Sequence, residues 1–139
     1  MIGFCMDLRS EIMDMVNTYI DWEADEYDPA HLLIYSGERP ATCQEVDEYE
    51  NTLLADFTLP YPCGTNTDGV ITFNSIADTV GLAAGTISWG RIVDSTGYVV
   101  MDLSATTHIG TGDLKFDSLD VEIGLVIHCT LATLTEGNP

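Results

Sequence analysis

Basic residues are scarce in this sequence. Its 139 residues include 4 Lys and Arg against 23 Asp and Glu, which gives a formal net charge of −19 at pH 7. A surface this acidic repels phosphate backbones and anionic lipid at long range, so the sequence argues against nucleic acid and bare membrane as partners. The same charge favours a basic protein surface or bound cations. Its plainest role is to keep many copies soluble and apart before they assemble.

Long apolar runs are also missing. No stretch approaches the roughly 18 apolar residues that a membrane-spanning helix needs. Residues 1–9 lack the charged start and apolar core of a secretory signal. We therefore expect a soluble protein that is synthesised in the cytoplasm. The length is that of one domain, and the hydrophobic fraction of 45% is ordinary for a globular protein.

Cysteines are few and widely spaced. Cys5, Cys43, Cys63 and Cys129 form no C-x-x-C pair, which argues against the usual zinc and redox motifs. Without a secretory signal we expect reduced thiols, mostly buried as small apolar side chains. A disulfide between Cys43 and Cys63 is the alternative that the even number of cysteines leaves open.

Catalytic and cofactor-binding motifs are absent as well. The sequence has no P-loop, no dinucleotide glycine fingerprint, no nucleophile elbow and no H-E-x-x-H. It therefore predicts no catalytic residue and no bound cofactor, and it argues against an enzyme. The three histidines, His31, His108 and His128, lie on a predicted strand start, a loop and a strand. They form a metal site only if the fold brings them together, and edge or half-buried positions are the simpler interpretation.

A second candidate metal site is a group of acidic residues near Lys115. Asp113, Asp117 and Asp120 surround Lys115 in a glycine-containing segment and offer oxygen ligands for a hard cation. A solvated loop is the simpler interpretation, because a chain this acidic brings carboxylates together by chance. The histidines and this group together keep open a small metal- or carbohydrate-binding β module.

Residues 7–21 carry apolar side chains at helical spacing: Leu8, Ile12, Met15, Val16, Tyr19 and Ile20. This pattern predicts an amphipathic helix from Met6 to Trp22, capped at its start by Asp7. Its apolar face either docks on another subunit or covers one end of the chain's own sheet. The acidic residues 21–29 end at Pro29 and are expected to form an exposed linker.

The stretch around Ser95-Thr96-Gly97 is a predicted hairpin. Apolar and polar residues alternate over residues 86–103 on both sides of this turn, and Gly97 accepts a positive φ without a steric penalty. Short β-prone runs on either side of the hairpin predict further strands at 31–35, 52–59, 70–76, 114–118 and 125–134. The last of these is long and apolar enough to lie near the centre of a sheet. Residues 43–51 and 104–112 are expected to be loops.

Strands at intervals of about ten residues, joined by Gly and Pro turns, predict a mainly β fold. We expect an antiparallel β-sandwich or jelly-roll-like domain over residues 30–139. One N-terminal amphipathic α-helix and an acidic linker, residues 1–29, precede it.

Four segments of the β region together resemble a family of small β-rich proteins encoded by tailed bacteriophages. The segments are residues 34–41 (IYSGERPA), 52–59 (TLLADFTL), 69–74 (GVITFN) and 85–97 (GTISWGRIVDSTG). In that family an IYSGxxPA segment precedes a TLLA strand, a G-T-A-x-W-x-R-I-x-D-S-x-G hairpin and a terminal strand. The likeness covers about residues 32–134, and the chain departs from the pattern at residues 43–51 and 113–123.

The resemblance implies a virion structural protein without catalytic residues. The function expected first is a capsid decoration, or cement, protein that binds the outside of the phage head and stabilises the shell. Its partner is then the major capsid protein, and its location is the capsid surface of the virion. A tail or neck component is the alternative within the same class.

Small domains that bind a shell multiply modest contacts through symmetric clusters. We therefore expect a homo-oligomer, with a trimer preferred over a dimer. The expected interface residues are Leu8, Ile12, Val16 and Tyr19 on the helix, and Trp89 and Arg91 in the hairpin. Arg91 is equally compatible with a carboxylate partner inside its own subunit.

Overall fold

The computed structural model describes residues 4–43, 45–46 and 49–135, which form one helix and twelve strands. The elements are α1 (Met6–Ile20), β1 (His31–Tyr35), β2 (Leu53–Thr58), β3 (Gly64–Thr67), β4 (Val70–Phe73), β5 (Thr79–Val80), β6 (Gly85–Thr86), β7 (Trp89–Val93), β8 (Val99–Thr107), β9 (Leu114–Phe116), β10 (Asp120–Val121), β11 (Val126–Ile127) and β12 (Cys129–Thr135). The predicted class, mainly β with one N-terminal helix, is confirmed.

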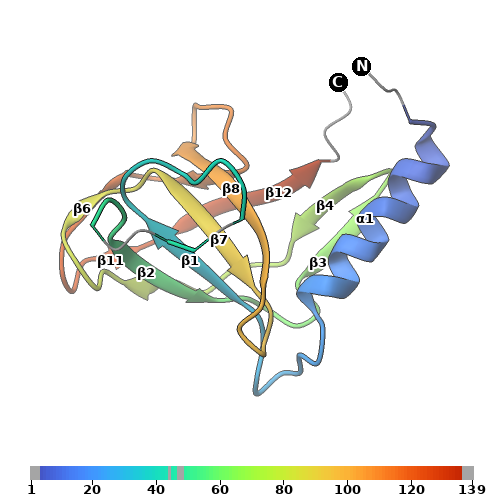
Figure 1. The fold of residues 1–139 in the computed structure, drawn as a ribbon, viewed down its shortest axis with the longest axis horizontal. Coiled ribbons are helices and arrows are strands. Elements are labelled where there is room, and N and C mark those ends of the chain that lie inside the picture. The colour runs from blue at the N-terminus through green and yellow to red at the C-terminus, as the bar shows by residue number, and fades with distance from the viewer. Residues whose placement is uncertain (1–3, 44, 47–48, 136–139) are drawn as a thin grey trace.

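Eight of these strands form one sheet in the order β2-β1-β7-β8-β9-β12-β4-β3. Its pairs are antiparallel except for β8 and β9, which run parallel, so the sheet is mixed. The sheet curls on itself (Figure 1). As a result Phe57 on the edge strand β2 contacts Phe116 on β9, with their ring centroids 6.1 Å apart. The core therefore lies between two parts of one curled sheet, which is mixed, whereas the sequence predicted an antiparallel sandwich.

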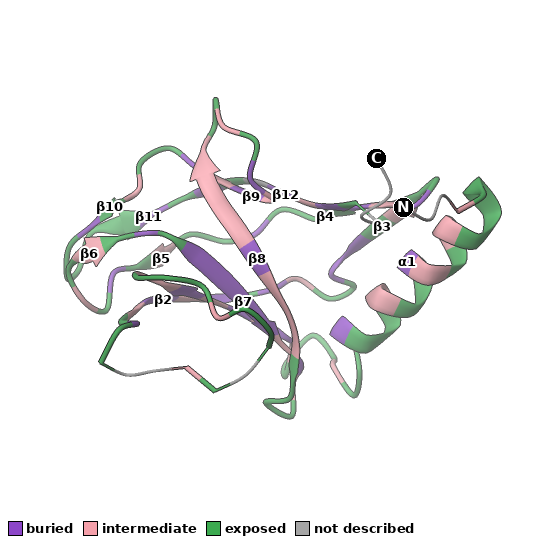
Figure 2. Ribbon diagram, turned by 45° about the horizontal axis from the view of Figure 1, so that its top comes forward, coloured by how far each residue is buried: buried purple, intermediate pink, exposed green. Residues whose placement is uncertain are grey.

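The core fills the inside of this curl, as the buried positions in Figure 2 show. Alternate residues of a strand face opposite sides, and Leu32 and Ile34 of β1 are both buried accordingly. Leu114 and Phe116 of β9 repeat the pattern. A Cβ added to Gly90 would lie 2.6 Å from Leu114 Cδ1, so any larger residue there would have to displace core side chains.

The hairpin is confirmed as β7 and β8. Asp94 Oδ1 accepts the backbone N–H groups of Thr96 and Tyr98, and Gly97 has a φ of +93°. Residues 104–107, expected to be loop, continue β8, because the chain pairs there with β9. Strand β3 was not predicted at all, since Gly-Thr-Asn-Thr has the composition of a loop. Pairing with β4 across the Asp68-Gly69 turn makes it a strand.

The predicted strand 125–134 is central, as expected, because β12 lies between β9 and β4. It is interrupted, however, and its register shifts between Cys129 and Leu131. Ile127 and Cys129 are buried before this bulge, whereas Ala132 and Leu134 are buried after it. One extra residue therefore exchanges the two faces, and the uniform alternation predicted for this segment is wrong beyond Cys129.

Helix α1 lies against the β3-β4 hairpin at one end of the sheet (Figures 1 and 2). Met13 and Ile20 are buried in this contact, and Asn66 Nδ2 of β3 donates to Asp14 Oδ1 at 2.7 Å. Asp7 does not cap the helix. Cys5 occupies the N-cap position without a side-chain cap bond, and Asp7 lies one residue inside the first turn, where its charge still favours the helix dipole.

The end of α1 is tied to the residue before β3. Cys63 donates its backbone N–H to Asp21 Oδ1 at 3.2 Å and its thiol to Asn17 Oδ1 at 2.8 Å. Burial raises the pKa of Cys63 to about 12 and also raises the pKa of Asp21. The linker that follows is largely exposed, as predicted, and turns on Asp25, whose Oδ1 accepts the N–H of Tyr27.

Candidate interaction surface

Trp89 and Arg91, two of the expected interface residues, do not lie at the surface. They are 1% and 4% exposed. Tyr35 stacks on Trp89 with ring centroids 4.7 Å apart, and the Arg91 guanidinium carbon lies 5.3 Å from the Trp89 ring centroid. The expectation that these side chains form an exposed contact surface is therefore wrong for the isolated chain.

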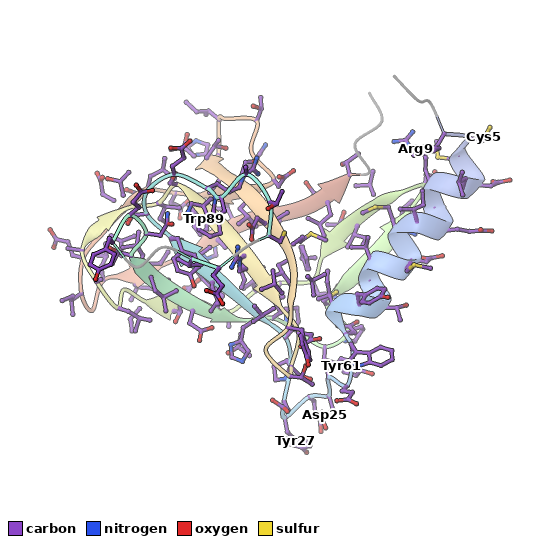
Figure 3. The ribbon with its side chains drawn as sticks, in the orientation of Figure 1. Cys5, Arg9, Asp25, Tyr27, Tyr61 and Trp89 are labelled. Atoms are coloured by element: carbon purple, nitrogen blue, oxygen red, sulfur yellow. The ribbon has the colours of Figure 1, made fainter. Side chains whose placement is uncertain are left out.

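Tyr35 of β1 covers one face of Trp89, and the described residues of the chain between β1 and β2 lie over the same side of the sheet. In Figure 1 the described parts of this segment pass in front of β1 and β7, and Trp89 of β7 is labelled in Figure 3. Asn51, which is 6% exposed, holds the base of the segment closed, because its Nδ2 donates to the carbonyl oxygens of Ser36 and Glu38. The local sequence pattern gives no sign of this cover.

An apolar groove of about 650 Å³ lies between α1 and the β7-β8 hairpin. Its lining residues are Val16, Tyr19 and Trp22 on the helix side, and Asp94, Tyr98, Val99, Val100 and Met101 on the hairpin side. Ser95 Oγ donates to the carbonyl oxygen of Trp22 at 3.1 Å and ties the end of the helix to the hairpin turn. The volume falls in the range of about 300–1,000 Å³ that is typical of ligand pockets.

Much of the groove's apolar surface is in contact with solvent. Tyr19 is 58% exposed, Trp22 53% and Tyr98 76%. Aromatic residues are enriched at protein-protein interfaces because they bury a large area and lose little conformational freedom. This groove is therefore the candidate interaction surface of the chain.

Two of the predicted helix residues belong to this groove and two do not. Val16 and Tyr19 line it. Ile12 packs partly against the core, and Leu8, near the start of α1, is 46% exposed outside the groove. The helix therefore covers its own sheet with one face and still presents apolar residues to solvent.

Sequence reasoning missed Trp22 and the hairpin side of the groove. Trp22 ends the predicted helix and also lies within the acidic residues 21–29, and the sequence does not mark it as an interface residue. Tyr98 and Val99 were recognised as hairpin residues, but nothing local indicates that they face α1. An exposed aromatic in an acidic segment was the one available signal.

The histidines lie in three separate places. His31 Nδ1 lies 2.7 Å from Asp56 Oδ1, His128 Nδ1 lies 2.5 Å from Asp78 Oδ1, and His108 is exposed. Within residues 4–43, 45–46 and 49–135, no three His, Cys, Asp or Glu side chains are grouped so that they could hold a metal ion. The convergence that a histidine metal site requires is thus not found there.

The acidic group near Lys115 is not gathered around a cation position either. Asp113 turns toward β8, where its Oδ2 accepts the backbone N–H and the hydroxyl of Ser104. Asp117 and Asp120 are exposed. The Asp113 carboxylate therefore binds Ser104 within the fold and does not point toward Asp117 and Asp120 as a shared cation site would require.

Comparisons with family models, curated proteins and solved structures found no match. Among the described residues, no helix combines the length and apolar character needed to cross a membrane.

Proposed function

We propose that this chain is a non-enzymatic structural protein of a tailed-bacteriophage particle. In this proposal it is a decoration subunit that binds the major capsid protein on the outer surface of the head and stabilises the shell. The observation that carries the proposal is the solvent-exposed, aromatic-lined groove on a protein of net charge −19. The resemblance of residues 32–134 to small phage proteins supplies the identity of the particle.

The charge supports a position on the outside of the shell. DNA packaged inside a head presents a dense array of phosphates, which repels a surface of this sign. The outer surface carries no such penalty, and there the charge also limits unwanted aggregation between particles.

Self-association is part of the proposal. Each contact between small domains is modest, so a symmetric cluster on the shell increases the overall affinity. We propose a homo-oligomer, with a trimer preferred over a dimer. Leu8 is one of the exposed apolar side chains outside the groove that can contribute a contact to it.

The test is a structure of purified particles by cryo-electron microscopy, together with quantitative mass spectrometry of the same particles. The expected result is density for the chain on the head exterior, at a copy number comparable to that of the capsid subunits. A copy number matching only a small ring at the neck or tail would instead support the alternative structural role. Absence from the particle would refute both.

A functional test complements this. Particles made without the chain are expected to release their DNA at a lower temperature than complete particles, and purified protein added back should restore the difference. Serum albumin at the same concentration is the control. Equal release temperatures with and without the chain would contradict the stabilising role.

A further inference from the structure

Strand β8 has a neighbour on both sides along only part of its length. It pairs with β7 from Val99 to Ser104, but it pairs with β9 only from Ala105 to Thr107. On the side away from β7, the first part of β8 therefore has no strand partner among the described residues. The groove described above lies along this open edge, because Val99, Val100 and Met101 line it.

The side of β8 to which each backbone N–H and C=O points follows from the hydrogen bonds of neighbouring residues. Ser104 donates its N–H to Asp113 Oδ2 at 3.3 Å, away from β7. Backbone groups two residues apart in a strand point to the same side, so the N–H and C=O of Asp102 also point to the open side. Arg91 and Asp102 are then a non-hydrogen-bonded pair, which agrees with the close contact of their side chains.

The opposite wall of the groove suits an extended chain. Val16, Tyr19 and Trp22 of the helix side face the edge of β8 across the groove, and the bond from Ser95 to Trp22 closes one end. When a strand is added to a sheet edge, main-chain hydrogen bonds supply affinity and pockets for alternate side chains supply specificity. Here the backbone N–H and C=O of Asp102 can supply the main-chain hydrogen bonds, and the aromatic residues of the groove can supply the pockets for side chains.

We propose that this groove binds an extended segment of a partner protein, which adds to the sheet as a strand beside β8. Alternate apolar side chains of the segment pack between α1 and β8, and its remaining side chains include lysine or arginine. The capsid protein as the source of this segment rests on the proposed function, whereas strand addition rests on the edge and the groove alone.

The net charge of the chain favours an extended segment with lysine or arginine in the groove over a second copy of the chain. Two copies of net charge −19 repel each other, and Asp94 adds a carboxylate to the groove lining. A cationic segment is attracted by the same field.

The probe is a fluorescein-labelled peptide of alternating valine and lysine, titrated into the full chain and followed by fluorescence anisotropy. Saturable binding is expected. The same peptide with every backbone nitrogen methylated keeps its side chains but has no backbone donors, and it should bind at least about tenfold more weakly. A valine-glutamate peptide tests the charge and should bind more weakly still. No saturation up to about 1 mM peptide, or equal binding of the methylated peptide, would overturn the proposal.

Variants of the chain locate the site. Tyr19→Ser and Trp22→Ser remove exposed aromatic surface and should each weaken peptide binding about fivefold or more. Tyr27→Ser is the matched control, since Tyr27 is 88% exposed, does not line the groove and points away from the chain at the tip of the linker (Figure 3). Equal effects of Tyr19→Ser and Tyr27→Ser would place binding elsewhere and refute the proposal.

Amide hydrogen exchange followed by NMR reports the added hydrogen bonds directly. The Asp102 amide should exchange rapidly in the free chain and at least about tenfold more slowly with saturating valine-lysine peptide. Amides around the exposed Ile109 serve as the internal control. Peptide binding without protection of Asp102 would rule out strand addition.

The proposed function and this inference can fail separately. Peptide binding at the groove by a chain that is absent from particles would support strand addition and refute the decoration role. Conversely, normal attachment of Tyr19→Ser and Trp22→Ser chains to heads would support the decoration role and refute the groove as its binding site.

Discussion

Arg91 and Asp102 lie directly opposite each other on β7 and β8. Arg91 Nε is 2.6 Å from Asp102 Oδ1 and Nη2 is 2.9 Å from Oδ2, so the guanidinium binds the carboxylate with two parallel bonds. Their side chains are 5% and 7% exposed. The hydrogen bonds to Asp102 raise the pKa of Arg91, which keeps the guanidinium charged. One of the chain's few cations is thereby used inside the hairpin.

Breaking this pair should destabilise the protein strongly. Asp102→Asn removes the carboxylate that holds the buried guanidinium with two hydrogen bonds, and the expected loss is about 3–5 kcal/mol of unfolding free energy. The double variant Arg91→Met/Asp102→Leu removes both charges and should lose much less. Urea denaturation of the three proteins measures the difference. The interpretation is wrong if the double variant is as unstable as Asp102→Asn.

The two tryptophans should differ in their access to solvent. Trp89 is 1% exposed and stacks against Tyr35, whereas Trp22 is 53% exposed in the groove. Acrylamide should therefore quench the Trp89→Phe protein, which keeps Trp22, more strongly than the Trp22→Phe protein. Emission of the second protein should also lie at shorter wavelength. Similar quenching of both would show that Trp89 is not shielded in solution.

Thiol reactivity should divide the cysteines into two pairs. Cys5 and Cys43 are exposed, while Cys63 and Cys129 are buried, and burial raises the pKa of Cys63 to about 12. Because the thiolate is the reactive form, a disulfide reagent at about pH 8 should modify the first pair rapidly and the second only after unfolding. Rapid native-state labelling of Cys63 would contradict this packing. The structure has Cys43 and Cys63 as free thiols, so the disulfide that the sequence left open is not formed.

His128 should titrate above the usual imidazole value. The hydrogen bond from His128 to the Asp78 carboxylate raises the pKa of His128. The stabilisation from this pair is therefore fully present below about pH 6.5, the unfolded value, and is lost as the pH rises through the folded pKa. An NMR titration measures the midpoint, and Asp78→Asn should lower it. An unchanged midpoint in that variant would exclude Asp78 as the cause.

Self-association should strengthen with ionic strength. Bringing copies of charge −19 together is unfavourable, and added salt screens this repulsion while apolar contacts persist. Light scattering between low salt and about 0.5 M measures the mass, and Leu8→Ser should weaken association. A monomer at every concentration of salt would refute assembly off the particle. Dissociation on adding salt would mean that ion pairs, not apolar contacts, drive it.

The elements that sequence predicted best are those set by local chemistry. The 3.6-residue spacing of apolar side chains located α1, and alternation around Ser95-Thr96-Gly97 located the hairpin. These signals succeed because helix periodicity and a positive φ at Gly97 depend on neighbours close in the chain. The apolar face of the helix also predicted two groove residues, Val16 and Tyr19.

Other features depend on partners far away in the sequence. The bulge after Cys129 exchanges the faces of β12, and it is defined by how this strand pairs with the distant strand β9. Trp89 and Arg91 carry no local sign of the residues that cover them. In the same way, the groove exists because packing on β3 and β4 holds α1 beside the open edge of β8. Periodicity determines which side chains share a face, but only the tertiary packing determines whether that face is buried, covered or left open, since the contacts that bury it come from distant segments.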